Sequence, residues 1–123
     1  MYFIKIKLKG YLKNINENTV ENIDTTAIKN HNIITYNNND TIHKINILDN
    51  KIILSRNNKN FSHELVFELL KDYDTEYYIK ELNTSINIKI KTTYLLIENN
   101  KIEIHYNVLD SNDEYLYFIE MSD

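Results

Sequence analysis

Arg56 is the residue whose chemistry stands out most, because it is the only arginine of the 123-residue chain. It follows the apolar run Ile52-Ile53-Leu54 and therefore lies at the end of an expected buried strand. Its guanidinium is planar and permanently charged, which suits a carboxylate or a phosphate. Two interpretations follow from this position. Arg56 either holds an anionic ligand where the strand ends, or forms a structural ion pair with an aspartate or glutamate.

Three tyrosines and one threonine are the other candidates for ligand contact: Tyr36, Tyr78, Tyr106 and Thr92. Tyr106 falls in phase with the apolar positions of its segment, and Thr92 continues the apolar row of another segment. Inward phenols would give a cavity an apolar body with polar tips. The alternative is that the tyrosines are core aromatics whose hydroxyls find a backbone partner, and that Thr92 ends a core layer.

Several kinds of chemistry are not expected from these residue types. The chain has no cysteine, which removes disulfides, cysteine-ligated metals and thiol nucleophiles. The four histidines, His31, His43, His63 and His105, show no metal-ligand spacing, and a single glycine cannot form a phosphate-binding loop. No serine lies in a nucleophile-elbow motif. We therefore expect no catalytic residue, no metal and no cofactor.

Alternation with a period of two dominates the segments that must position these candidates. It is clearest in residues 4–9, 86–91 and 101–108, where apolar side chains alternate with polar ones. This pattern predicts half-buried antiparallel strands. Asn-rich breaks separate the segments and replace the usual Gly and Pro, since Asn tolerates positive φ. Two-residue hairpin loops are expected at Asp49-Asn50 and Asn99-Asn100, both with positive φ.

One segment is ambiguous between helix and strand. In residues 61–73 the apolar side chains recur at helical spacing, and Ser62 suits a helix N-cap. The rest of the chain is typical of short strands, which favours an all-β domain over residues 1–123. A closed antiparallel barrel is the expected architecture, because closure removes exposed strand edges.

The ordered set of segments resembles the YwiB-like family of uncharacterised bacterial proteins. The residues that carry the resemblance are Lys7–Gly10, Ile33–Tyr36, Lys44–Ile47, Ile52–Arg56, Glu64–Glu68, Tyr78, Ile86–Thr92 and Ile104–Tyr106. The resemblance implies a calycin-like, lipocalin-like barrel of about 8–10 strands, with Glu64–Leu69 as a strand. It implies no activity. Barrels of this class hold small apolar ligands in their mouths.

Charge and hydropathy limit the partners and the location. The net charge is −4 and the pI is about 5.5, which disfavours general nucleic-acid binding. Lys5, Lys7 and Lys9 would form a basic stripe with Lys89 and Lys91 only if their strands were neighbours. No run of about 18 apolar residues occurs, and the first residues alternate rather than form a signal sequence. A cytoplasmic protein without membrane contact is expected.

The leading hypothesis is non-enzymatic binding of a small, partly apolar anionic ligand in the barrel. Arg56 would select the anionic end, and Tyr36, Tyr78, Thr92 and Tyr106 would line the cavity. The alternative is a structural or interaction protein that acts through a homodimer or a partner surface on the last strand. That surface would consist of exposed Tyr115, Tyr117 and Ile119.

Overall fold

The computed structural model describes residues 3–123 and folds them into ten strands. The strands are β1 (Ile4–Asn14), β2 (Thr19–Asn30), β3 (Ile33–Asn38), β4 (Thr41–Ile47), β5 (Lys51–Asn57), β6 (Phe61–Glu68), β7 (Asp72–Ile79), β8 (Thr84–Ile97), β9 (Lys101–Val108) and β10 (Asp113–Ser122). Each strand pairs with its neighbours in sequence, and β10 closes the barrel against β1. All pairs of strands are antiparallel. The predicted all-β antiparallel barrel is confirmed.

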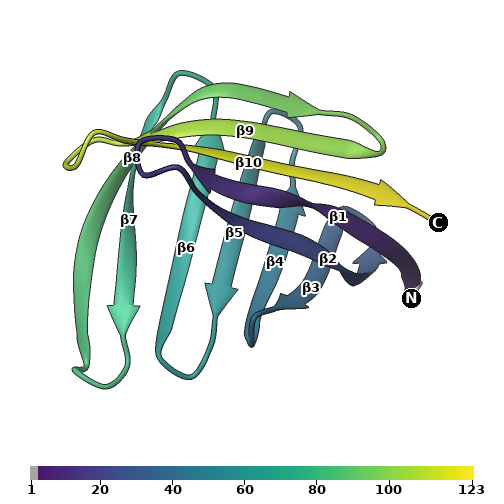
Figure 1. Ribbon diagram of the computed structural model, residues 1–123, viewed down its shortest axis with the longest axis horizontal. Helices are drawn as coiled ribbons and strands as arrows, with labels where there is room; N and C mark the ends of the chain where they lie inside the picture. The colour runs from purple at the N-terminus through teal and green to yellow at the C-terminus, as the bar shows by residue number, and fades with distance from the viewer. Residues whose placement is uncertain (1–2) are drawn as a thin grey trace.

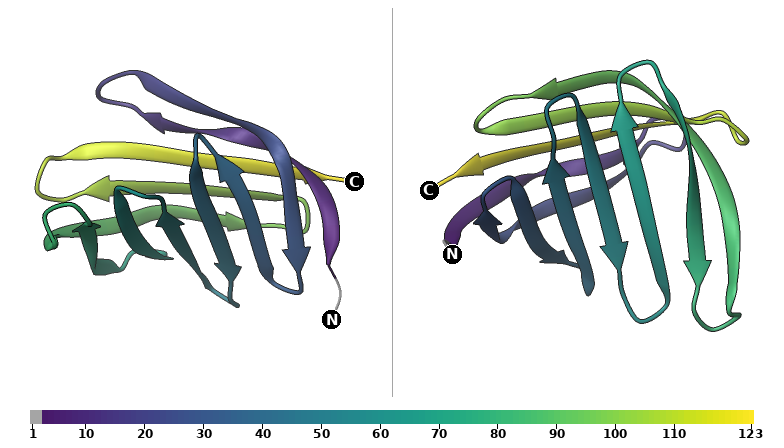
Figure 2. Two further views of the ribbon diagram at one scale, coloured as in Figure 1. Left: turned by 90° about the horizontal axis from the view of Figure 1, so that it is seen from below. Right: turned by 180° about the vertical axis from the view of Figure 1, so that it is seen from behind.

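The barrel is flattened into two crossed layers. Strands β3 to β7 run steeply across β1, β9 and β10 (Figures 1 and 2). Strand β8 belongs to both layers, since its first half pairs with β7 and its second half with β9. A β-bulge between Thr92 and Tyr94 marks the change of direction, as bulges bend the strand that carries them. No helix within residues 3–123 has the length and apolar character needed to cross a membrane.

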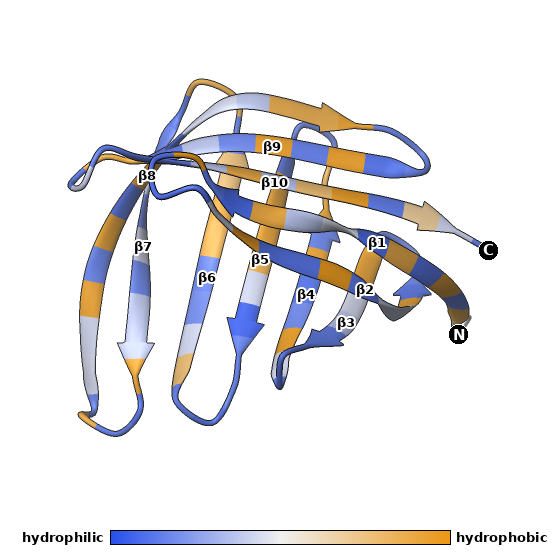
Figure 3. Ribbon diagram, viewed as in Figure 1, coloured by the Kyte–Doolittle hydropathy of each residue, from blue (hydrophilic) through white to orange (hydrophobic). Residues whose placement is uncertain are grey.

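Isoleucine is the commonest residue at the inward positions. The banding along each strand in Figure 3 shows the alternation of apolar and polar residues. Ile45, Ile52 and Phe67 are fully buried, and they come from three neighbouring strands. Burial of each such side chain stabilises the fold by roughly 1.5–3 kcal/mol. The isoleucine-rich rows therefore build one continuous core inside the barrel.

The ambiguous segment is a strand followed by a turn. Phe61–Glu68 forms β6, which confirms the strand implied by the family resemblance and shows that the helical interpretation is wrong. Inward Leu65 and Phe67 are buried, and Val66 adds one partly buried apolar residue on the opposite face. Apolar residues on both faces of a strand imitate helical spacing over a short window.

Eight of the nine connections between strands contain at least one Asn. Positive φ occurs at Asn18, Asn39, Asp40, Asn83 and Asn112, and also at His31 and Leu70. Both predicted hairpins form, yet Asp49-Asn50 and Asn99-Asn100 keep negative φ, so the positive-φ prediction for them is wrong. A bond from the Leu48 amide to the Lys51 carbonyl closes the first of these loops at 2.9 Å. Successive positive-φ residues are instead found at Asn39-Asp40.

The connection between β6 and β7 contains no Asn and stores strain at Leu70. This side chain is 68% exposed and its φ is 63°, a region that costs a bulky residue roughly 1–3 kcal/mol. We expect Leu70→Gly to raise the free energy of unfolding by about 1 kcal/mol, measured by urea denaturation. Leu69→Gly, at a neighbouring position with negative φ, should lower it. A destabilised Leu70→Gly would contradict the assignment of strain.

Candidate ligand-binding site

A row of polar and aromatic side chains crosses five neighbouring strands at one level of the barrel interior. Its members are paired directly with one another across the strands. We refer to these residues as the polar row: Tyr36 of β3, His43 of β4, Arg56 of β5, His63 of β6 and Tyr77 of β7. Directly paired side chains on one face have Cβ atoms about 4.5–5.5 Å apart. The row therefore brings one guanidinium between two imidazoles.

Arg56 has no acidic partner within residues 3–123. None of the four ion pairs found there includes it, and its Nε atom is buried without a hydrogen-bond partner. The guanidinium carbon lies 5.3 Å from the centroid of the Phe61 ring, a cation–π distance. The structural ion pair considered from the sequence is therefore not formed. Arg56 retains its capacity to bind an anion.

The two flanking histidines are held neutral. Burial, followed by the charge of Arg56, lowers the pKa of both His43 and His63 to about 4. His43 stacks on Tyr36 with the ring centroids 4.5 Å apart, and neither of its ring nitrogens has a partner. His63 Nε2 lies 2.9 Å from Thr75 Oγ1. Near pH 7 Arg56 is therefore the only cation of the polar row.

Tyrosines of β9 and β10, on the opposite wall of the barrel, enclose the polar row. The hydroxyls of Tyr36 and Tyr117 are hydrogen-bonded at 2.6 Å, and Tyr106 stacks on Tyr115 with centroids 5.2 Å apart. Burial raises the pKa of Tyr36, Tyr106 and Tyr117, so these phenols stay neutral. They supply apolar surface and contribute no charge that would compete for Arg56.

A cavity of about 370 Å³ opens beside Arg56 at the mouth of the barrel. Apolar and aromatic side chains dominate its lining: Leu12, Leu65, Tyr77, Ile88, Ile90, Tyr106, Val108 and Tyr115, with Arg56, His63, Ser111 and Asp113 as the polar members. We call it the mouth cavity. Its volume lies within the range of small-molecule sites.

Deeper in the barrel the free space is much smaller. An inner cavity of about 10 Å³ lies among Arg56, His43, Tyr36 and Tyr117. Such a volume corresponds to about one water molecule. A ligand therefore does not reach Arg56 through the inner cavity, which is too small for an organic group.

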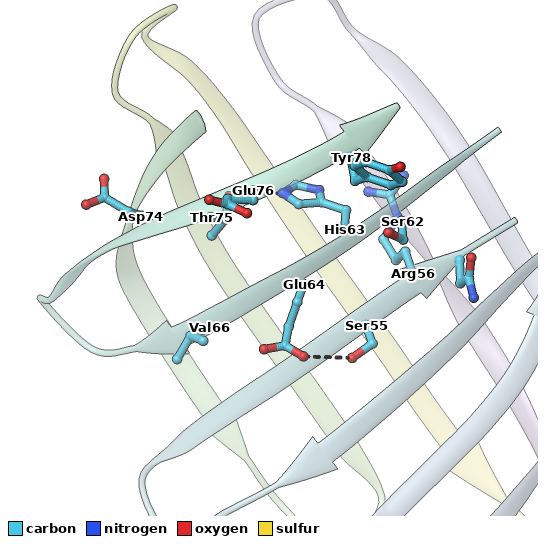
Figure 4. Close-up of a pocket in the computed structure, with 11 residues that line it drawn as sticks. Ser55, Arg56, Ser62, His63, Glu64, Val66, Asp74, Thr75, Glu76 and Tyr78 are labelled. Carbon is cyan, nitrogen blue, oxygen red and sulfur yellow. Dashed lines mark hydrogen bonds between the residues drawn. The ribbon is translucent and has the colours of Figure 1, made fainter. Parts of the chain in front are cut away.

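A second cavity, of about 530 Å³, lies in the barrel wall where β6 and β7 separate. These strands pair only between Phe61–His63 and Tyr77–Ile79. Figure 4 shows His63 and Thr75 across this opening, with Glu64 and Ser55 on a neighbouring part of the wall. Arg56 and His63 line both the wall cavity and the mouth cavity. These two residues are therefore accessible from two sides.

Three of the five predicted site residues line the mouth cavity or the inner cavity, and a fourth lines the wall cavity. Arg56 and Tyr106 line the mouth cavity, and Tyr36 lines the inner cavity with them. Tyr78 lies on the outer face, where its hydroxyl is hydrogen-bonded to Asn83 and where it lines the wall cavity that Arg56 also lines. Thr92 is fully buried and lines none of these cavities, so it ends a core layer. The inward position predicted for Tyr78 belongs to its neighbour Tyr77.

Sequence reasoning missed His43, His63 and Tyr77 as members of the site. The signal for the histidines was present, since His43 is in phase with buried Ile45 and His63 with buried Leu65. The spacing of the histidines is unsuitable for a metal, and spacing alone indicates no other role for them. Tyr77 and Tyr78 are identical in type, so only the strand pairing distinguishes which one faces inward.

The last strand and the lysine stripe differ from expectation. Tyr117 and Ile119 are buried inside the barrel, so the prediction that they form an exposed partner surface is wrong. Phe118, on the outer face, packs against Tyr11 with ring centroids 5.7 Å apart. Strand β1 neighbours β2 and β10 rather than β8, so the lysines of β1 and β8 form no continuous stripe. Self-association stays a prediction.

Comparison with known proteins supports the fold. No family model and no curated protein matches the sequence. The crystal structure of the YwiB protein from Bacillus subtilis is similar, with a TM-score of 0.71 over 98% of this chain and 90% of that chain. The sequence identity is 12%, so the likeness is one of fold. The chain has a YwiB-like β-barrel fold.

Proposed function

We propose that this protein binds a small, partly apolar anion in the mouth cavity, with the anionic group on Arg56. The role is non-enzymatic, and the protein acts in the cytoplasm. The observation that carries the proposal is an unpaired guanidinium beside a cavity of about 370 Å³ with a mainly apolar lining. Such a site matches a ligand with one charged end and a hydrocarbon or aromatic body.

The chemistry of the neighbouring groups supports binding rather than catalysis. Thr75 is the hydroxyl closest to an imidazole in the site, but it donates its proton to the Ile88 carbonyl at 2.7 Å. A hydroxyl engaged in this way cannot also donate to His63, so the histidine does not activate it as a nucleophile. The polar row contributes charge and hydrogen bonds that select a ligand.

Linear fatty acids test the proposal with defined probes. We expect hexanoate, octanoate and decanoate to bind the wild-type protein at pH 7.5, as measured by isothermal titration calorimetry. Each buried methylene contributes about 0.8 kcal/mol, so affinity should rise about fourfold per carbon until the cavity is full. Arg56→Met should lower the affinity for decanoate at least about tenfold, because a hydrogen-bonded charge pair contributes roughly 1.5–3 kcal/mol.

Lys89→Met is the matched control. It also removes one positive charge, but Lys89 lies on the outer face, with its Nζ 3.8 Å from Asp74. It should bind decanoate as the wild type does. Arg56→Met should fold normally, since Arg56 takes part in no ion pair within residues 3–123. Equal affinities of the Arg56 variant and the wild type, or no binding by the wild type, would refute the proposal.

A further inference from the structure

A chain of hydrogen bonds determines which nitrogen of His63 carries the proton. Thr75 Oγ1 lies 2.7 Å from the Ile88 carbonyl oxygen, to which it donates its only hydroxyl proton. The same Oγ1 lies 2.9 Å from His63 Nε2 and can only accept there. The proton of the neutral imidazole is therefore on Nε2. His63 Nδ1 carries a lone pair and acts as a hydrogen-bond acceptor.

The residue that carries this acceptor is the cross-strand neighbour of Arg56. His63 and Arg56 are directly paired across β5 and β6, and both line the mouth cavity and the wall cavity. Within residues 3–123, His63 Nδ1 takes part in no hydrogen bond. It is also not one of the side-chain atoms that are fully buried without a hydrogen-bond partner, so a ligand atom can approach it. The pKa of His63 is lowered to about 4 by burial and by Arg56, so Nδ1 stays unprotonated near pH 7. The same two cavities are thus lined by one residue with a guanidinium donor and one with an imidazole acceptor.

We propose that the head group of the ligand is a carboxylate with a hydrogen-bond donor on the adjacent carbon, as in a 2-hydroxy acid. The carboxylate binds Arg56 and the hydroxyl donates to His63 Nδ1. This inference rests on the proposed function and identifies the chemical class of its ligand. His63 is then the specificity-determining residue, and Thr75 is the positioning residue that holds its tautomer.

The close pairing of the two side chains favours this arrangement over a more distant donor. Directly paired positions hold their Cβ atoms about 4.5–5.5 Å apart, which favours ligand groups that are joined through neighbouring carbons. A plain fatty acid has no donor for His63 and leaves the Nδ1 lone pair without a partner when it covers the site. An acceptor that loses water without gaining a donor costs binding free energy.

The test compares 2-hydroxydecanoate with decanoate, which differ only in the hydroxyl. We expect the wild-type protein to bind the hydroxy acid roughly 3- to 10-fold more tightly at pH 7.5, by calorimetry, since a neutral hydrogen bond contributes about 0.5–1.5 kcal/mol. His63→Leu and Thr75→Val should bring this ratio close to one. His105→Leu, on the outer face next to Glu103, should leave the ratio unchanged.

A measurement without ligand tests the tautomer independently. The imidazole ¹⁵N shifts of His63 should report a protonated Nε2 and an unprotonated Nδ1 in the wild type. A protonated Nδ1 would overturn the inference even if a variant failed to fold. Tight binding of decanoate through Arg56 with a ratio of one would overturn the inference and leave the proposed function standing. If neither acid binds, both are refuted.

Discussion

Replacement of Gly10 by alanine is expected to lower the free energy of unfolding by at least about 3 kcal/mol. A Cβ atom built on Gly10 would lie 1.8 Å from the carbonyl oxygen of Phe118 and 2.8 Å from Cα of Ile119. Both are backbone atoms of β10, which no side-chain rotation can move away. Gly10 pairs with Ile119 where β1 and β10 close the barrel, so relief of the clash would open this seam.

Urea denaturation followed by circular dichroism measures this effect. Lys9→Ala is the matched control, because Lys9 is exposed on the same strand and should change stability by no more than about 0.5 kcal/mol. A soluble Gly10→Ala protein within 1 kcal/mol of wild type would show that β1 and β10 do not approach as closely as described. Failure of Gly10→Ala to fold, with normal folding of Lys9→Ala, agrees with the prediction.

Acid should destabilise the protein through His43 and His63, beginning below pH 6.5. Both have a pKa of about 4 in the folded state, whereas an unfolded histidine has a pKa near 6.5. Between these values the unfolded chain binds protons that the folded chain does not. The free energy of unfolding therefore decreases as the pH is lowered. From pH 6.5 to 5 the loss is roughly 1.5 kcal/mol for each histidine, because the slope reaches about 1.4 kcal/mol per pH unit only once the unfolded histidine is fully protonated.

Urea denaturation at a series of pH values from 7.5 to 5 measures this dependence. His43→Gln and His63→Gln should each remove about half of the decrease in the free energy of unfolding between pH 7.5 and pH 5. This holds whatever the stability of each variant at pH 7.5. His31→Asn, in the exposed turn between β2 and β3, should retain the full dependence. Curves for the His43 and His63 variants that run parallel to the wild-type curve would contradict the assigned cause.

Local pattern predicted the architecture well because alternation and turn residues act within a few positions. The rows of isoleucine and the turns that contain Asn predict where the strands lie. They do so correctly even though the chain contains no proline. The positive φ of Leu70 could not be predicted in this way. It is imposed by the approach of the turn to β8, where the Leu70 amide donates to the Thr92 carbonyl at 2.8 Å. A constraint set by a distant strand leaves no local signal.

Arg56, at the centre of the candidate site, could be predicted from the sequence, but the two histidines beside it could not. Arg56 was identifiable because a lone arginine at the end of an apolar strand is a chemical exception in this chain. Its neighbours His43 and His63 depend on the registers of β4, β5 and β6, which bring residues 13 and 7 positions away to its sides. Register is a property of strand pairing, so the relay from His63 through Thr75 to the Ile88 carbonyl could not be inferred beforehand.

The single arginine also allows the most direct test of the central claim. The protein contains one guanidinium, so its ¹⁵Nε–¹Hε signal in an NMR spectrum belongs to Arg56 without further assignment. On titration with decanoate, this signal should shift progressively and saturate together with the mouth-cavity residues Leu65 and Ile88. A signal that stays unchanged while decanoate binds, or a spectrum unaffected by decanoate at saturating concentration, would contradict anion binding at Arg56.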